Sequence, residues 1–266
     1  MNKEKHTVLY ISHGAGPLPV LGDEGHTEMV DNLKLLAREI PRPSAILVVS
    51  AHWEETVPTV TTSKRPELYY DYYGFPAESY ELQYPAPGEP DLARSVREAL
   101  ADKGFKTGTE DERGLDHGVF IPLTIMFPEA DIPCVQLSLI KGLDPAAHVA
   151  MGEALAGLDY DNLLIIGSGF SFHNMRAFFA QDTDETRSRN EGFEQWLIET
   201  CSAPDLDYEE RKKRLVDWES APHARYCHPR EEHLLPLHVC CGATGKASTE
   251  YYRLNIIGKR SSAYRW

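Results

Sequence analysis

The chain has 266 residues, of which 42% are hydrophobic and 26% are charged, and its formal net charge at pH 7 is -14. A chain of this length and composition can bury enough apolar surface to fold without disulfides or a structural metal. The negative charge argues against binding to nucleic acid or to an anionic membrane, because both would be repelled.

The N-terminus predicts neither a signal peptide nor a membrane span. Residues 1–6 are mostly polar and lead into an apolar strand of about five residues, which is too short to cross a bilayer. The five cysteines include no C-x-x-C pair, and Cys240 and Cys241 lie in an apolar helical stretch. We therefore interpret these two as buried thiols rather than zinc ligands, and we expect a cytoplasmic protein, in which thiols stay reduced.

The first part of the chain alternates apolar runs with amphipathic segments. Residues 7–11 predict a buried strand, residues 25–39 carry apolar side chains at helical spacing, and residues 45–50 predict a second buried strand. This order is typical of a βαβ unit and predicts parallel pairing. Residues 64–90 are dense in Tyr, Pro and Gly and predict a long, ordered surface loop, a kind of segment that is often functional.

The rest of the chain continues this alternation without a repeat or a linker. It predicts a single α/β domain over residues 1–266, with a central, mostly parallel or mixed sheet flanked by helices. Residues 183–220 are charged and helical and are expected to form a solvated flank or an oligomer contact. The other expected elements are helices over 91–103, from about 116, over 145–158 and over 231–242, and strands over 133–139, 162–167 and 251–257.

Three of the eleven histidines lie at, or a few residues after, the carboxyl ends of predicted strands. These are His13, His52 and His173, and the crevice outside the carboxyl ends of parallel strands is where ligands bind. Neutral imidazole binds Zn(II) and Fe(II) alike, so the residue type does not choose the ion. The pattern predicts a shared metal or acid–base site, which His117 and His233 could join.

The remaining histidines are expected to have structural roles. His238 follows His233 by five positions of the predicted helix, so the two side chains point roughly 140° apart and do not readily bind one ion. Glu231 and Glu232 fall in the first turn of that helix and are interpreted as capping carboxylates. The histidines without any positional pattern are His6, His26, His148 and His223.

Several other site classes have no motif in the chain. Residues 167–171 lack the G-x-S-x-G pattern of a nucleophile elbow. Walker A, G-x-G-x-x-G and H-E-x-x-H patterns are also absent from the sequence.

Seven groups of residues follow one another in an order that carries a family resemblance. They are Ser12-His13-Gly14, Ser50 to Trp53, Tyr70 to Pro76, Tyr84 to Gly88, Leu115 to Gly118, Gly167 to Gly169 with His173-Asn174, and His228-Pro229 with Glu232 to Leu237. Each motif is weak alone, but the ordered series resembles the class III extradiol ring-cleavage dioxygenases of the LigB superfamily. The resemblance covers residues 7 to about 257, and the branch it is most similar to is that of the DOPA 4,5-dioxygenase-like proteins.

The resemblance implies one mononuclear metal ion and a role for each histidine. His13 and His52 match the motif histidines that bind the ion, and His233 matches the region of the third ligand, where more distant members supply a glutamate. His173 matches the histidine usually assigned as acid and base, and in this branch it is also a candidate metal ligand. His117 matches a position near the substrate. The residues that are alternatives or additions to His233 as ligand are His228, Glu231 and Glu232.

The function hypothesis that follows is insertion of O₂ into a catechol-type ring, DOPA-like or related, which opens the ring beside the diol. Fe(II) is the expected ion for activity, because Zn(II) has no accessible redox change, although Zn(II) could be the ion bound. Residues 68–88 are expected either to wall a flat substrate or to pack in the core. The alternatives are a zinc hydrolase and a non-catalytic, Memo-like binding module of the same superfamily.

Overall fold

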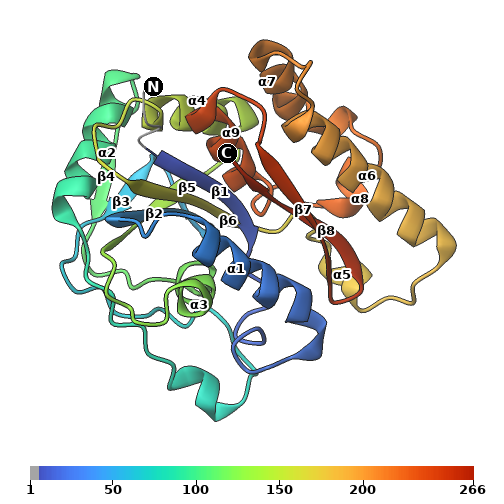
Figure 1. Cartoon of the computed structure of the whole chain (residues 1–266), viewed down its shortest axis with the longest axis horizontal. Helices are drawn as coiled ribbons and strands as arrows, with labels where there is room; N and C mark the ends of the chain where they lie inside the picture. Colours follow the sequence, from blue (N-terminus) through green and yellow to red (C-terminus); the bar gives the residue numbers. More distant parts are fainter. Residues whose placement is uncertain (1–5) are drawn as a thin grey trace.

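The apolar runs of the sequence form the centre of an eight-stranded mixed sheet (Figure 1). The computed structural model describes residues 6–266. The strand order is β4-β3-β5-β2-β6-β1-β8-β7. The strands are β1 (His6–Ser12), β2 (Ala45–Glu55), β3 (Thr59–Thr61), β4 (Gly108–Glu110), β5 (Cys134–Ile140), β6 (Leu163–Gly169), β7 (Glu250–Ile256) and β8 (Lys259–Arg265).

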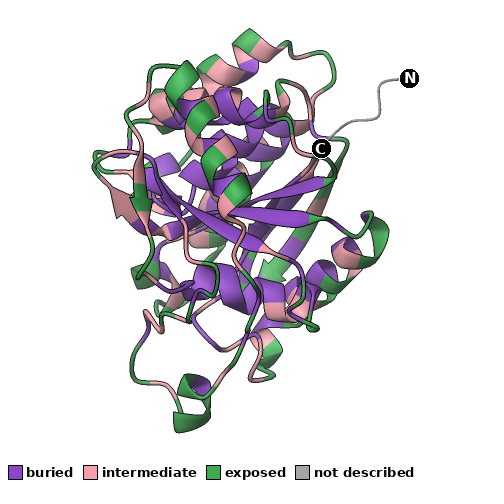
Figure 2. Cartoon of the chain, turned by 90° about the vertical axis from the view of Figure 1, so that its left-hand side faces the viewer, coloured by how far each residue is buried: buried purple, intermediate pink, exposed green. Residues whose placement is uncertain are grey.

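The four central strands, β5, β2, β6 and β1, are parallel. They are buried on both faces, which is why they read as continuous apolar runs rather than alternating ones (Figure 2). The βαβ unit predicted at the start of the chain needs one correction. Strands β1 and β2 run parallel but do not pair with each other, because β6 lies between them and pairs with both.

The outer strands make the sheet mixed, and most of them were not predicted from sequence. Strand β3 pairs antiparallel with β5, and β8 pairs antiparallel with both β1 and β7. The tail of the chain, from which the sequence predicted nothing, therefore forms β8 beside the first strand. The α/β class and the mixed central sheet are confirmed.

Helices cover both faces of the sheet (Figure 1). Helices α2, α4 and α9 pack on one face, and α1 and α3 pack together on the other. The α-helices are α1 (Thr27–Glu39), α2 (Pro90–Asp102), α3 (His117–Met126), α4 (Pro145–Leu155), α5 (Met175–Phe178), α6 (Asp184–Ser202), α7 (Tyr208–Val216), α8 (Ala224–Cys227) and α9 (Leu235–Thr244). Short 3-10 turns are η1 (Glu24–His26), η2 (Ala77–Tyr80) and η3 (Trp218–Ser220).

Helix α9 begins four residues later than the sequence predicted. Its N-cap is Leu234, which makes no side-chain cap, so the interpretation of Glu231 and Glu232 as capping carboxylates is wrong. His233 lies in the turn before the helix, so the expectation that it shares a helix with His238 is wrong. His238 is inside α9 and hydrogen-bonds through Nε2 to the carbonyl of Leu215, 2.7 Å away.

The charged segment over residues 183–220 is only partly a solvated flank. Helix α6 packs on β8 and buries Phe193, Leu197 and Cys201. The expectation that this segment makes an oligomer contact stays a prediction. All five cysteines are free and buried, as expected for Cys240 and Cys241.

Residues 1–5, part of the segment for which neither a signal peptide nor a membrane span was predicted, lie outside the described residues. Within residues 6–266, no helix has the length and apolar character needed to cross a membrane.

Candidate metal centre

The strand ends bring the predicted histidines together at one edge of the sheet. His13 follows directly on β1, and Ser12 pairs with Gly169 at the end of β6. His52 lies within β2 rather than after it, which corrects the sequence prediction. The register between β2 and β5 shifts between Val49 and Glu54, and this irregularity lets a side chain from inside a strand face the carboxyl-end crevice.

Three imidazoles converge through the same ring nitrogen. The Nε2 atoms of His52 and His13 are 2.9 Å apart, and the Nε2 atoms of His233 and His52 are 3.3 Å apart. His13 and His233 are almost fully buried, and His52 is partly exposed toward the crevice. Ligand atoms of these three residues all lie within 4.8 Å of one another, so the group can hold a single ion.

The outer nitrogen of each ring already has a partner. Ser168 donates its hydroxyl proton to the carbonyl of Gly118, so its oxygen accepts from Nδ1 of His13 at 3.0 Å. Nδ1 of His233 lies 2.9 Å from a carboxylate oxygen of Glu232, and Nδ1 of His52 lies 3.5 Å from one of Asp71. These partners assign the proton to Nδ1 in each ring and leave the three Nε2 lone pairs facing one another. Such an arrangement suits a cation, and outer partners of this kind are typical of metal-binding histidines.

Burial keeps these three imidazoles neutral. The pKa of His13, of His52 and of His233 is lowered well below its ordinary value, first because burial disfavours the charged form and then because other histidines lie close by. A metal ligand must present an unprotonated nitrogen. The site is therefore ready to bind a cation without first losing protons.

Two further histidines, His117 and His173, lie beside the three converging ones. Nδ1 of His117 lies 2.8 Å from Oδ1 of Asp71, and Nδ1 of His173 lies 3.2 Å from Oε1 of Glu232. The ring of His173 stacks on that of His233 with 3.4 Å between centroids. We call His13, His52 and His233 the trio, and His117 and His173 the outer histidines. Asp71 contacts His52 of the trio and the outer His117. Glu232 contacts His233 of the trio and the outer His173.

The charge state of both carboxylates is set by these contacts. Burial would raise the pKa of Asp71, but the hydrogen bonds with His117 outweigh burial and lower it. For Glu232, burial is likewise outweighed, mainly by the hydrogen bond with His173, and the pKa is lowered. Both groups are ionised at neutral pH and hold the proton of the facing imidazole on Nδ1.

Two glycines let the backbone approach the cluster closely. A Cβ atom on Gly118 would lie 2.5 Å from Oγ of Ser50 and 3.2 Å from the ring of His52. A Cβ atom on Gly169 would lie 2.1 Å from the carbonyl of His233. These contacts explain why the short motifs around His117 and Ser168 contain glycine.

A cavity of about 540 Å³ opens onto the histidines. Aromatic and aliphatic side chains form most of its wall, including Tyr72 and Phe75 from the Tyr- and Pro-rich loop. That loop also packs inward, because Tyr84 is buried and donates to the carbonyl of Phe127. Residues 68–88 therefore both line the cavity and pack in the core, and their role against a substrate stays a prediction.

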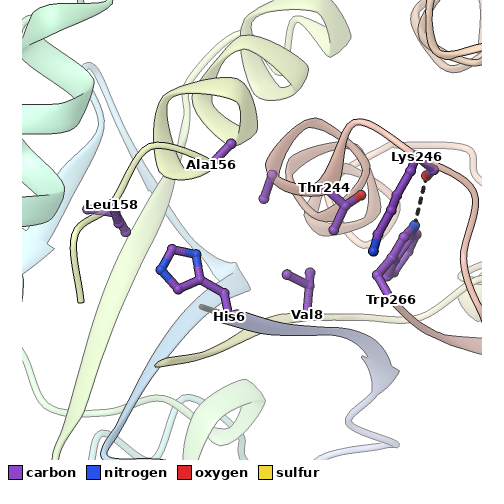
Figure 3. A pocket seen from close by; sticks show the side chains of 8 residues that line it. His6, Val8, Ala156, Leu158, Thr244, Lys246 and Trp266 are labelled. Atoms are coloured by element: carbon purple, nitrogen blue, oxygen red, sulfur yellow. Dashed lines mark hydrogen bonds between the residues drawn. The ribbon is translucent and has the colours of Figure 1, made fainter. Parts of the chain in front are cut away.

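A different hollow lies near the start of β1 (Figure 3). His6 and Lys246 line it, together with Val8 and Trp266. Within the described part of the chain, each group of His, Cys, Asp or Glu side chains that could share an ion belongs to the cluster at the carboxyl ends. The hollow of Figure 3 therefore does not compete as a metal site.

The structure separates the alternative third ligands that the sequence left open. His228 is fully buried behind the site, and its Nε2 lies 2.6 Å from the carbonyl of Ser171. Burial lowers the pKa of His228 to about 3. Glu231 is half-buried and pairs with Arg225 at 2.6 Å. Glu232 lies inside the site, against His173 and His233.

The histidines assigned structural roles lie outside the cluster. His26 binds Asp23 through Nδ1 and accepts from the backbone of Ala15, and His148 accepts from the backbone of Ile140. His223 precedes α8 in a left-handed conformation, and His6 begins β1.

Sequence reasoning missed several polar residues that surround the histidines. Asp71 is a lone carboxylate in the aromatic run of residues 69–75, which is the one sequence signal that points to it. Asp116 is fully buried and accepts hydrogen bonds from Ser50 and Arg113 at 2.7 and 3.0 Å. Ser168 was considered only as part of a nucleophile pattern. Asp71 and His117 are 46 positions apart, and Ser168 and His13 are 155 apart, so the sequence does not show which histidine each of them contacts.

Comparison with known proteins gives one family over almost the whole chain. Residues 8–263 match the model of the catalytic LigB subunit of aromatic ring-opening dioxygenase. The chain is 40% identical over 274 aligned positions to a protein of Hapsidospora irregularis named dioxygenase tasH, covering 97% of this chain and 85% of that one. It is 39% identical over 243 positions to 4,5-DOPA dioxygenase extradiol of Beta vulgaris, covering 90% and 87%.

A solved structure shows the same fold. The crystal structure of an uncharacterized protein from Escherichia coli K12 superimposes with a TM-score of 0.74 at 29% sequence identity. The match covers 97% of this chain and 98% of that one.

Proposed function

Because the chain belongs to the LigB family of aromatic ring-opening dioxygenases, we propose that it inserts both atoms of O₂ into a catechol-type ring and opens the ring beside the diol. The observation that carries this proposal is the convergence of three unprotonated Nε2 atoms below an apolar cavity. A flat aromatic ring suits such a wall, and a diol suits a cation held at its base.

We assign the metal to His13, His52 and His233. Three protein ligands leave further positions open on the ion, as a catalytic site requires. The bound ion, which we propose to be Fe(II), would supply the exchange of electrons between the diol and O₂ that Zn(II) cannot provide. Glu232 supports His233 from behind and is not needed as a ligand itself.

His173 is the proposed acid and base. Its Nδ1 faces Glu232, so Nε2 is the nitrogen available to take a proton from the substrate diol. The ionised carboxylate behind the ring stabilises the imidazolium that forms. His173 can later return the proton as the ring opens. The stacking on His233 fixes the ring plane during these steps.

His117 is the proposed substrate-facing partner on the other side. Its Nδ1 is held by Asp71, and its ring packs against that of His52 with 3.9 Å between centroids. Nε2 of His117 is therefore available to hydrogen-bond a substrate oxygen in the cavity. The two outer histidines flank the trio, so the substrate is held between them.

The alternatives from sequence are a zinc hydrolase and a non-catalytic module. The matched family is that of an aromatic ring-opening dioxygenase, and the relatives reported above are named dioxygenase and 4,5-DOPA dioxygenase extradiol, which favours neither alternative. The five histidines around one cavity also exceed what a binding module needs.

The test is oxygen uptake by protein loaded anaerobically with Fe(II), with DOPA, protocatechuate, caffeate and 4-methylcatechol as substrates. We expect one O₂ consumed per catechol and a yellow ring-opened product that contains both atoms of ¹⁸O₂. Oxygen consumption without label in the product would indicate a catechol oxidase instead. Turnover that persists without O₂ would indicate a hydrolase and overturn the proposal.

A further inference from the structure

The mouth of the site cavity is unusually apolar for a solvent-facing surface. Tyr73, Phe179 and Met175 are 92%, 85% and 53% exposed, and they are the three most exposed large hydrophobic side chains among the described residues. All three line the same cavity. Exposed apolar side chains that gather at one opening are typical of a surface that receives an apolar ligand.

The wall of the cavity offers no partner for a charged substituent. Among the described residues that line it, none is Lys, Arg, Asp or Glu. The charged groups that contact the outer histidines are the carboxylates of Asp71 and Glu232. A substrate carboxylate would be desolvated there without a cation beside it, which is unfavourable.

Arg113 and Arg230 contact groups of the histidine network, and both are paired. Arg113 binds Asp116 at 3.0 Å and the carbonyl of His52 at 3.2 Å. Arg230 binds Glu54 at 2.6 Å and Glu232 at 3.4 Å. Neither side chain lines the cavity, so neither is placed to receive a substrate carboxylate.

We infer that the substrate is a catechol with a bulky, uncharged, apolar substituent that lies against Tyr73, Met175 and Phe179 at the mouth. This inference rests on the proposed ring-opening function and names its substrate class. The diol would lie at the histidines, the ring between Tyr72 and Phe170, and the substituent would extend outward. A catechol that bears a carboxylate or an amino-acid group, such as DOPA, would be a poor substrate.

The first experiment compares two substrates that differ in charge and by one methyl group. They are 3-(3,4-dihydroxyphenyl)propanoate and its methyl ester, with 4-methylcatechol as a reference too short to reach the mouth. We expect kcat/KM for the ester to exceed that for the acid by about tenfold or more. Anaerobic calorimetric titration measures binding without turnover, and it should show a higher affinity for the ester than for the acid.

The second experiment changes the mouth. Phe179→Ser should lower kcat/KM for the ester by roughly tenfold and leave 4-methylcatechol unchanged. Met175→Arg should shift the ratio of kcat/KM values toward the acid, because it places a cation among the residues that line the cavity. Val216→Ser, which removes an exposed apolar side chain on α7, is the matched control. It should change neither the kcat/KM of the ester relative to 4-methylcatechol nor that of the ester relative to the acid.

The outcomes separate this inference from the function on which it rests. The inferred substrate class would be wrong if kcat/KM for the acid exceeds that for the ester. It would also be wrong if neither Phe179→Ser nor Met175→Arg changes the relative kcat/KM values. Ring opening would stand in both cases. Failure to open any of the three catechols would overturn the proposed function and the inference with it.

Discussion

At the scale of single residues, the site is built from two carboxylates that each orient two histidines. Asp71 faces His52 and His117, and Glu232 faces His233 and His173. In each pair, one histidine belongs to the trio proposed to bind metal and the other is proposed to act on the substrate. A change at either carboxylate should therefore affect both functions, whereas a change at an outer histidine should affect one.

Glu232→Gln tests this shared role. The variant keeps the size of the side chain but removes the charge that fixes the proton on Nδ1 of His233. We expect metal affinity to fall by about 10- to 100-fold, as measured by competition with a chromogenic chelator. Glu231→Gln is the matched control, because Glu231 pairs with Arg225 at the surface. Equal affinity in Glu232→Gln and Glu231→Gln would contradict the orienting role.

His173→Phe tests proton transfer separately from metal binding. A phenyl ring can keep the stacking on His233 but has no nitrogen to accept a proton. We expect kcat to fall by roughly 10²- to 10⁴-fold across the pH range, with bound iron within twofold of the wild type. Elemental analysis and oxygen uptake measure the two quantities. Undiminished turnover at any pH would remove His173 from the acid–base role.

At the scale of elements, helix α6 is held to strand β8 around a buried carboxyl group. Glu194 accepts a hydrogen bond from the hydroxyl of Ser262 at 2.7 Å, and its other oxygen has no hydrogen-bond partner within the protein. Burial raises the pKa of Glu194 to about 7 from an ordinary value of 4.5. Between these values, the folded protein holds a proton that the unfolded chain has lost.

The sign of the resulting pH dependence follows from linkage. The contribution of Glu194 to the free energy of unfolding is largest at low pH. The free energy of unfolding then falls as the pH rises toward 7, because the unfolded chain loses this proton first. Glu194→Gln cannot titrate, so its stability relative to the wild type should rise by roughly 2 kcal/mol between about pH 5.5 and pH 8. Urea unfolding at both values measures this difference. The exposed Glu191→Gln on the same helix controls for the loss of one carboxylate, and a pH-independent difference for Glu194→Gln would contradict the assignment.

The elements also show what the sequence could and could not predict. Strands β1, β2, β5 and β6 were predictable because both of their faces are buried, which leaves a continuous apolar run. Strands β3 and β4 have three residues each, too few to show a period. Strand β8 is buried although it is rich in polar residues, because Lys259 pairs with Asp182 and Ser262 with Glu194. Partners so far away in sequence cannot be read from a local pattern.

The same reason limits what the sequence gives at the site. Histidines at strand ends were a usable signal, because topology alone brings those ends together. Glu232 was assigned to a helix that begins only at Leu235, so its contact with His173 could not be foreseen. Asp71 meets His117 across 46 positions of chain. The chemistry of the histidines could be predicted, but the carboxylates that tune them required the fold.

At the scale of the whole molecule, the net charge of -14 favours the substrate class inferred from the cavity. A strongly negative protein slows the approach of anions, and salt screens that repulsion. We expect kcat/KM for 3-(3,4-dihydroxyphenyl)propanoate to rise between low and high ionic strength, while that for its methyl ester stays flat. Stopped-flow oxygen uptake over a salt series measures both. A fall in kcat/KM for the acid would indicate attraction to a local cation, which the cavity wall does not show.

The proposed metal also connects distant parts of the chain. Its ligands come from the end of β1, from β2 and from the turn before α9, so the ion would join positions 13, 52 and 233. An ion that binds only the folded state stabilises it by about 2.7 kcal/mol at 100 times its dissociation constant. For a chain of this size, that energy corresponds to a rise in Tm of roughly 5–10 °C.

Chelator-stripped protein should therefore gain that increase in Tm when Fe(II) is added without oxygen. His52→Ala should lose most of the increase, because two remaining imidazoles hold the ion weakly. His223→Asn, at an exposed position outside the cluster, is the matched control and should keep the full increase. An equal rise in Tm for His52→Ala and the wild type would mean that the ion binds elsewhere. The proposed ligand set would then be wrong even if the enzyme opens catechol rings.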